Sequence, residues 1–185
     1  SLIMNYPNEK SIANDGVMHE GDISTRLGLR GIPALAEEMM VDRDLNLCKY
    51  TEGKLHLSYI STKNSLNKIK QAKAKGLNIT ADVTIHNLFL TENSVNNFDT
   101  RYKVMPPLRT KKDTLALLKG LKNGTIDVIS TAHSPINNEY KKIEFDNAKN
   151  GIIGLETAFG LIGKYVLPNL SLEKIIEKIS INPRK

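Results

Sequence analysis

The chain has 185 residues, of which 40% are hydrophobic and 25% charged, a balance typical of a globular domain with one core. It contains no run near the roughly 20 apolar residues of a membrane span, and its single cysteine excludes an internal disulfide and favours a cytoplasmic setting. The formal charge of +6 does not indicate nucleic-acid binding, because the lysines are scattered and aromatic residues do not alternate with them.

The first predicted helix begins near Pro33, a residue that suits the first turn of a helix. Apolar side chains recur at helical spacing through residues 36–47, and Cys48 follows them on the same helix. We interpret Cys48 as a small packing residue rather than a nucleophile. Residues 54–62 (KLHLSYIST) then alternate in character, which predicts a buried strand.

A second helix is predicted where residues 66–72 show helical spacing, and it should end at Gly76. Residues 78–84 (NITADVT) are rich in strand-forming residues and predict the next strand. A long polar loop that contains two adjacent prolines is expected over residues 91–112. This part of the chain therefore has the order strand, helix, strand, loop.

The second half continues the alternation. Asp113 is expected to cap a helix over residues 115–121 that stops at Gly124. Residues 125–131 (TIDVIST) predict another strand, and residues 155–166 are apolar with a helical period.

A final helix, capped by Ser171, is predicted over residues 172–179. Strands that alternate with helices imply parallel strands, either in an open doubly wound sheet or in a (β/α)8 barrel. No glycine-rich turn of the dinucleotide-binding kind joins a strand to a helix. A barrel needs about 250 residues. This chain offers about four βα units, so we expect the later part of a barrel whose N-terminal portion is absent from this sequence.

In parallel α/β folds, function gathers at the carboxyl ends of the strands. Three expected strand ends carry polar side chains, at residues 59–62, 83–87 and 130–135. The loop 102–109, which contains the two adjacent prolines, adds a fourth element. These segments form the candidate site.

The chain resembles class I dihydroorotase, a zinc amidohydrolase that interconverts carbamoyl-aspartate and dihydroorotate in pyrimidine synthesis. Residues 16–38 (GVMHEGDISTRLGLRGIPALAEE), 124–129 (GTIDVI), 151–158 (GIIGLETA) and 181–184 (INPR) carry the resemblance. Dihydropyrimidinases and allantoinases fit less well over the first of these segments. The resemblance implies a TIM-like (β/α)8 barrel of the metal-dependent amidohydrolase type, with residues 1–185 as the C-terminal part of a single barrel domain.

Five positions that carry function in this family are changed. By resemblance, two metal-ligand histidines are replaced by Tyr6 and Tyr59, and the aspartate that binds metal and acts as general base is replaced by Ala132. A substrate-contacting asparagine is replaced by Met105, and a final histidine by Ile136. All five losses therefore fall in one site.

These losses remove the chemistry that zinc requires. Zinc prefers imidazole, thiolate or carboxylate ligands, whereas a phenol with a pKa near 10 competes poorly and alanine offers no donor. We therefore expect no zinc and no metal-dependent catalysis. Tyr6 and Tyr59 either fill the space left by the metals or line a pocket that binds an anion or a base without turnover.

The four histidines and one arginine need separate interpretations. His86 and His133 lie at strand ends and could form a residual pocket or a non-standard metal site. His56 is expected to be a hydrogen-bonded structural residue, and His19 a loop residue. Arg109 could contribute to a pocket or make a structural pair.

The leading hypothesis is a dihydroorotase-like pseudoenzyme of pyrimidine biosynthesis. The resemblance implies that it assembles with aspartate transcarbamoylase, so we expect a structural or regulatory role in an oligomer. The rival hypothesis is an active zinc-dependent dihydroorotase with an atypical metal site, completed by an upstream HxH pair and by His86 or His133. Binding to nucleic acid or to a membrane is not expected.

Overall fold

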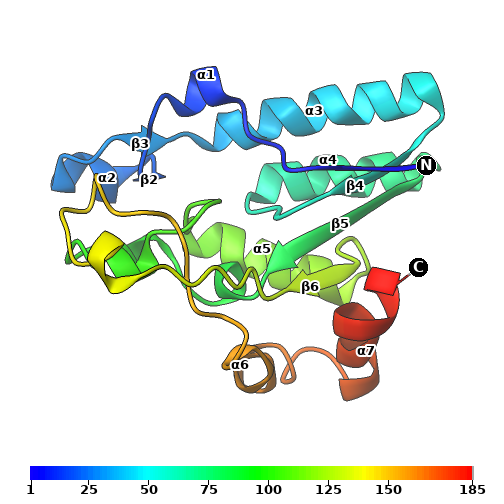
Figure 1. Ribbon diagram of the computed structural model, residues 1–185. Helices are drawn as coiled ribbons and strands as arrows, with labels where there is room; N and C mark the ends of the chain where they lie inside the picture. Colours follow the sequence, from blue (N-terminus) through cyan, green and yellow to red (C-terminus); the bar gives the residue numbers. More distant parts are fainter. Residues whose placement is uncertain (185) are drawn as a thin grey trace.

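Four parallel strands form the main sheet in the computed structural model, which describes residues 1–184. Their spatial order is β1 (Leu2–Asn5), β4 (Lys54–Leu57), β5 (Ile79–Thr84) and β6 (Val128–Ser130), as Figure 1 shows. The register places Asn5 beside Leu57, Leu57 beside Ala81, and Thr84 beside Ser130. The strands therefore end near one edge of the sheet, and the expectation of parallel strands is confirmed.

Three helices pack on one face of this sheet and on one another, namely α3 (Ala34–Thr51), α4 (Lys63–Ala74) and α5 (Lys111–Lys122) (Figure 1). Alternate strand residues belong to the apolar core that these helices share, and Leu57, Ala81 and Val83 are wholly buried there. Because side chains alternate along a strand, the residues between them face the opposite side. His56 and Asp82 lie on that side and contact each other. The sheet is thus apolar toward the helices and polar toward the side that a closed barrel would enclose.

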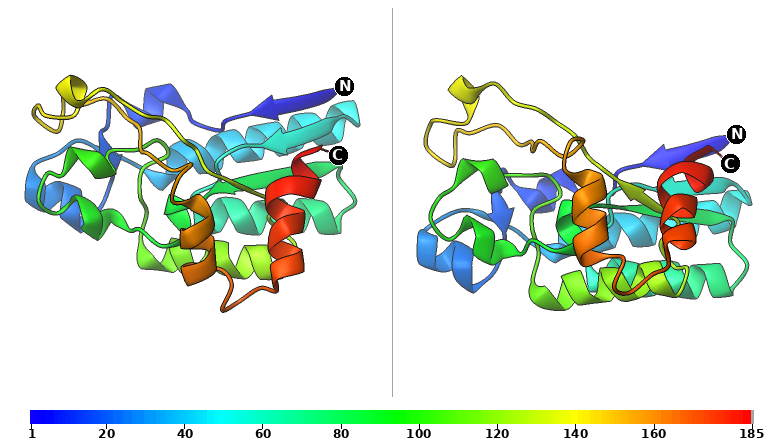
Figure 2. Two further views of the ribbon diagram at one scale, coloured as in Figure 1. Left: turned by 60° about the horizontal axis from the view of Figure 1, so that its bottom comes forward. Right: turned by 90° about the horizontal axis from the view of Figure 1, so that it is seen from below.

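The C-terminal helices lie beside β6, at the opposite edge of the sheet from β1 (Figure 2). They are α6 (Ala158–Tyr165), α7 (Leu172–Ile176), the π-helix η5 (Glu177–Ile181) and the 3-10 turn η6 (Asn182–Arg184). Ile162 and Ile175 insert into the main core. These elements therefore belong to the same packing unit as the sheet.

Short elements gather beyond the carboxyl ends of the strands (Figure 1). They are α1 (Lys10–Ala13), β2 (Met18–His19), α2 (Asp22–Leu27), β3 (Gly31–Ile32), η1 (His86–Leu88), η2 (Glu92–Val95), η3 (Thr100–Tyr102) and η4 (Asn138–Tyr140). β2 and β3 form a separate parallel pair. A second apolar cluster holds this region together, and it includes Met18, Val104 and Phe145.

The helix starts differ in detail from the sequence expectations. Thr110, not Asp113, is the N-cap of α5, and Asp113 completes a capping box from the third helical position. Pro33 is the N-cap of α3 and stands one residue before its first turn. Ser171 caps α7 as predicted, through a bond from the backbone N–H of Lys174. Cys48 is a buried packing residue, as predicted.

Two predicted strands are shorter than expected, and one strand was missed. β4 ends at Leu57, because Tyr59 takes a positive φ of 58° that no strand can continue. β6 begins only at Val128. β1 carried no strand prediction. The segment 91–112, which was expected to be a polar loop, does not lie wholly on the surface, because Val95, Val104 and Leu108 are buried.

The strand β1 and the helix α6 both expose large apolar side chains. Ile3 and Met4 on β1 are 60% and 66% exposed, and Phe159 on α6 is 63% exposed. A groove of about 370 Å³ with a mainly apolar lining runs between β1 and α3. No helix within residues 1–184 is long and apolar enough to cross a membrane.

Leu57 provides a test of the core. Leu57→Ala removes a wholly buried side chain at the centre of the sheet, so we expect it to lower the free energy of unfolding by about 2–5 kcal/mol. Leu115→Ala is the matched control, because Leu115 is 55% exposed on α5, and its effect should stay within about 0.5 kcal/mol. Urea unfolding of the full-length protein measures both, and equal effects would contradict this placement of Leu57.

Candidate functional site

The ends of the four strands bring the predicted site residues to one rim. Tyr6 follows β1 directly, while Tyr59, His86 and Ala132 each stand two residues beyond β4, β5 and β6. Because the strands are adjacent and parallel, these four positions follow one another around the rim in the order of the strands. The sequence prediction of a site at this edge therefore agrees with the topology.

A cavity of about 290 Å³ opens at this rim. Its lining is Tyr59, His86, Val104, Met105, Ala132, His133, Ser134, Asn150, Gly151 and Ile152. Five predicted site residues are among them, and they come from the ends of three strands and from the proline-containing loop. Tyr6, Arg109 and Ile136 are not part of this lining.

Tyr6 contacts the site through an aromatic pair. Its ring meets the ring of Tyr59 edge-on, with centroids 6.0 Å apart and an angle of 61° between the planes. Burial raises the pKa of the Tyr6 phenol above its usual value, and the nearby Glu37 carboxylate adds to this effect. The Tyr6 phenol is therefore neutral near pH 7, which makes it a poor metal ligand.

Two of the positions that are expected to be changed have an unusual backbone. Tyr59 and Ala132 have φ angles of 58° and 45°, in the left-handed region that non-glycine residues seldom adopt. The Asp82 carboxylate accepts a hydrogen bond from the Tyr59 backbone N–H at 3.0 Å, and the hydroxyl of Ser130 accepts one from the Ala132 N–H at 3.2 Å. The surrounding structure thus holds both positions in a conformation that their own side chains do not favour.

His56 contacts Asp82, the residue that holds the Tyr59 backbone. Its Nε2 lies 2.9 Å from Asp82 Oδ2, and its Nδ1 lies 2.7 Å from Thr80 Oγ1. With both ring nitrogens occupied, His56 orients the carboxylate that holds the Tyr59 backbone. The interpretation of His56 as a hydrogen-bonded structural residue is confirmed.

The two remaining histidines of the rim differ in their partners. His133 Nδ1 accepts hydrogen bonds from the backbone N–H groups of Gly154 and Leu155, both at 3.2 Å. His86 is 3% exposed, and neither of its ring nitrogens has a hydrogen-bond partner within the described residues. Burial lowers the pKa of His86 to about 4, so its ring is neutral at pH 7.

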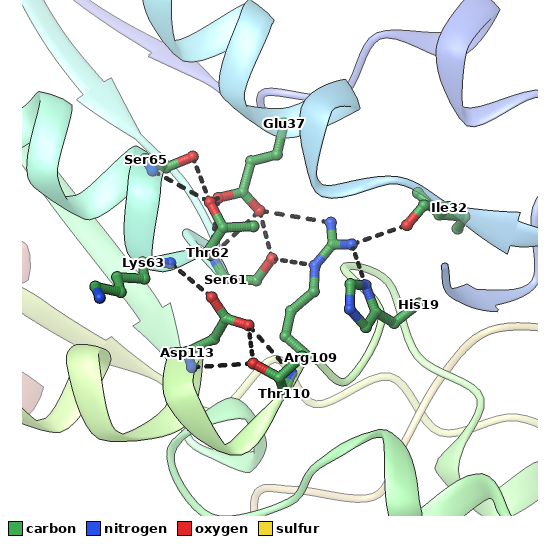
Figure 3. A network of polar contacts seen from close by, with 10 residues as sticks. All are labelled: His19, Ile32, Glu37, Ser61, Thr62, Lys63, Ser65, Arg109, Thr110 and Asp113. Atoms are coloured by element: carbon green, nitrogen blue, oxygen red, sulfur yellow. Dashed lines mark hydrogen bonds and ion pairs between the residues drawn. The ribbon is translucent and has the colours of Figure 1, made fainter. Parts of the chain in front are cut away.

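Arg109 belongs to a buried polar network behind the rim (Figure 3). Its Nε donates to Ser61 Oγ at 3.0 Å, and its Nη1 donates to the Ile32 carbonyl at 2.9 Å and contacts His19 Nδ1 at 3.1 Å. Its Nη2 lies 3.9 Å from a carboxylate oxygen of Glu37. Of the two interpretations of Arg109, the geometry favours the structural pair.

Glu37 is the acceptor at the centre of this network. Its carboxylate accepts hydrogen bonds from the backbone N–H groups of Ser61 and Thr62, at 3.1–3.2 Å, and from both of their hydroxyls. The sequence prediction did not assign Glu37 a role, although the AEE motif that contains it was one carrier of the resemblance. An acidic residue in the first turn of α3 was the only local signal of this role.

His19 also departs from its prediction. It lies on the short strand β2 and is 8% exposed, so it is not a loop residue. Burial and the neighbouring Arg109 lower its pKa to about 4. His19 is thus a neutral partner within the Arg109 network.

Met105 and Ile136 lie in different surroundings. Met105 lines the cavity and also packs against the small cluster around Ile32 and Ala36. Ile136 lies close to Gly151, where an added Cβ would come within 2.6 Å of the Ile136 side chain. Only Met105 therefore contributes directly to the cavity wall.

The donor set does not fit a catalytic zinc centre. The cavity lining offers two imidazoles, one phenol and no carboxylate. Within residues 1–184, no group of three His, Cys, Asp or Glu side chains is placed to hold a metal ion. These residues alone cannot provide the three protein ligands that a catalytic zinc takes.

The comparisons relate the chain to known proteins over its whole length. Residues 1–65 match the protein family described as Dihydro-orotase-like. The chain is 46% identical to a dihydroorotase of Thermoanaerobacter sp. (strain X514) and 45% identical to one of Carboxydothermus hydrogenoformans. Each match covers 100% of this chain and 43% of the relative. The chain thus spans less than half the length of the relatives it matches.

Solved structures share the fold at lower sequence identity. A D-hydantoinase superposes with a TM-score of 0.81 at 23% identity, over 100% of this chain and 43% of its own. A dihydroorotase in complex with 5-fluoroorotic acid, from Saccharomyces cerevisiae, gives a TM-score of 0.75 at 18% identity, over 98% of this chain and 48% of its own. The chain therefore has the fold of part of an α/β barrel, as predicted.

The Glu37–Arg109 network can be tested by a double-mutant cycle. Glu37→Gln and Arg109→Met each leave a buried partner uncompensated, so each should lower the free energy of unfolding by about 3–5 kcal/mol. The double variant removes both charges and should lose less than the sum of the two, by about 0.5–3 kcal/mol. Urea unfolding measures the cycle, and additivity within about 0.5 kcal/mol would show that the two side chains do not act together.

Proposed function

We propose, from the premise that this chain is homologous to the dihydroorotases and forms part of a dihydroorotase-like protein, that its metal centre has been lost and that it serves pyrimidine biosynthesis without hydrolysing a cyclic amide. One observation carries the proposal. Tyr59 and Ala132, at two family ligand positions, stand at one cavity, and Tyr6, at a third, packs on Tyr59. A hydrolytic zinc works by lowering the pKa of a bound water, and these side chains supply neither its ligands nor a base.

The retained structure suggests what such a protein still does. The bonds to Glu37 and the pair of His56 and Asp82 keep the rim in shape, although the donors that the rim would present are gone. A barrel that keeps its geometry without its chemistry is suited to bind other proteins. We propose aspartate transcarbamoylase as the partner, in a mixed oligomer in which this protein is a structural or regulatory subunit.

A second candidate function rests on the two histidines of the cavity. His86 and His133 line the same space, and residues outside this chain could complete an atypical zinc site. The protein would then be an active zinc-dependent dihydroorotase. Metal content separates this candidate from the first, because turnover by such a site requires bound zinc.

Zinc content and turnover test the proposal on the full-length protein. We expect well under one zinc per chain by elemental analysis and no zinc-dependent hydrolysis of dihydroorotate. The double variant Tyr59→His with Ala132→Asp should raise the zinc content, because it restores an imidazole and a carboxylate. Tyr140→His is the control, since Tyr140 is exposed and lies outside the cavity. Stoichiometric zinc together with zinc-dependent turnover in the unmodified protein would overturn the proposal.

Association with aspartate transcarbamoylase is tested separately. The full-length protein and the transcarbamoylase of the same organism should elute together in size-exclusion chromatography at micromolar concentration. Light scattering then gives the stoichiometry of the complex. Separate elution of the two proteins at this concentration would rule out the scaffold role and leave the metal prediction unaffected.

A further inference from the structure

Folding collects the positive charge of the chain on two neighbouring helices. The sequence carries 26 lysines and arginines and 20 aspartates and glutamates. Helix α4 with its C-cap Lys75, taken together with helix α5, holds nine of the lysines and a single acidic residue, Asp113. These two segments therefore have a net charge of +8, whereas the rest of the sequence has a net charge of −2. Lysines that are scattered along the sequence thus lie in one part of the fold.

The two helices present these lysines on one outer surface. α4 and α5 pack against each other (Figure 1), and the contact is close, because a Cβ at Gly120 would come within 2.8 Å of the Leu66 side chain. The buried residues of both helices belong to the main core, so the exposed residues point away from the sheet. We call the exposed lysines of this surface the lysine face: Lys63, Lys70, Lys75, Lys111, Lys112, Lys119 and Lys122.

The charge of the lysine face is not neutralised within the chain. The other two lysines of the helices have acidic partners, since Lys68 pairs with Asp42 and Lys73 with Asp127. Among residues 1–184, the seven lysines of the lysine face form no ion pair. Their ammonium groups are therefore free to meet carboxylates of another molecule.

Three of these lysines stand where the helices themselves disfavour them. Lys63 is the first residue of α4, and Lys111 and Lys112 are the first two of α5. A helix carries a partial positive charge at its N-terminus, where acidic residues are favourable and lysines are not. The Lys63 backbone N–H donates to Asp113 at 2.8 Å, which joins the two helix starts, while the Lys63 side chain points away from that carboxylate (Figure 3). Helix stability therefore does not account for this cluster.

An exposed apolar side chain stands among the lysines. Leu115 is 55% exposed on α5 and lies one turn from Lys111, Lys112 and Lys119. An apolar centre within a polar rim is the arrangement of protein–protein interfaces. The sequences of α4 and α5 contain no arginine and no aromatic residue, the side chains that most often read or stack on nucleic-acid bases. The surface therefore fits an acidic protein better than a nucleic acid.

We propose that the lysine face docks a partner protein through a surface of Asp and Glu side chains that surround an apolar contact for Leu115. An exposed ion pair is weak by itself, so the attraction comes from several lysines together. Such an attraction speeds association and declines as salt screens the charges. The lysine face lies outside the rim, so the inference does not rest on the proposed loss of the metal centre.

A labelled random copolymer of glutamate and tyrosine is a suitable probe, because it offers carboxylates together with apolar rings. Fluorescence anisotropy should show saturable binding to the full-length protein, tighter than the binding of a DNA duplex. Raising the salt from about 0.1 M to about 1 M should weaken binding of the copolymer at least tenfold, since the screening length falls about threefold. Absence of saturable binding would overturn the proposal. Tighter binding of the duplex would overturn it in favour of a nucleic-acid surface.

Charge reversal at the helix starts separates binding from stability. The triple variant Lys63→Glu, Lys111→Glu and Lys112→Glu should weaken binding of the copolymer at least tenfold. It should not lower the urea midpoint, because acidic residues suit the first turn of a helix. Unchanged binding by this variant would overturn the role of the lysine face.

A matched control carries the same change of net charge elsewhere on the surface. Lys10→Glu, Lys49→Glu and Lys142→Glu replace exposed lysines outside α4 and α5 and should leave binding of the copolymer unchanged. Equal losses in the two triple variants would show an effect of net charge alone and overturn the proposal. Leu115→Ala should weaken binding several-fold without a change in the urea midpoint, and normal binding by this variant would overturn the apolar contact. Zinc-dependent hydrolysis of dihydroorotate would overturn only the proposed function.

Discussion

The carboxylate of Glu37 joins three segments that are far apart in the sequence. It receives the backbone N–H groups that follow β4 and lies opposite the Arg109 guanidinium. It thereby connects the first turn of α3, the end of β4 and the loop that carries Met105 into the cavity wall. A charged group that is buried this deeply must be fully hydrogen-bonded. The position of the cavity wall therefore depends on this one acceptor.

At the rim, the hydrogen bonds that hold the backbone do not involve the side chains that would carry the chemistry. Tyr59 and Ala132 keep left-handed backbone conformations, although neither side chain offers a good zinc ligand. Asp82 and Ser130 bind the backbone at these positions rather than the side chains, so a side-chain replacement leaves the supporting bonds in place. The backbone of the rim is therefore held by bonds that do not depend on the side chains at these two positions.

Much of the fold was predictable from local pattern. The helices α3, α4, α5 and α7 and the strand β5 followed from periodicity and from turn or cap residues, because those signals act within a few residues. β1 was missed because it is a four-residue strand whose apolar side chains are largely exposed. β4 was predicted too long, because its alternation continues in the sequence past Leu57, where the backbone turns to meet Asp82.

The candidate site was predicted in part of its membership but not in its organisation. The sequence by itself determined the parallel βα order, three of the four strand ends that form the rim, and the residue types that stand at the rim, among them Tyr6, Tyr59 and Ala132. Only the tertiary structure decided that Arg109 serves the fold, and that His86 lines a cavity and has no hydrogen-bond partner among residues 1–184. Residue type sets which bonds a side chain can make. Which of these bonds it makes depends on groups that folding brings close from distant segments, and a local sequence pattern does not predict which groups these are.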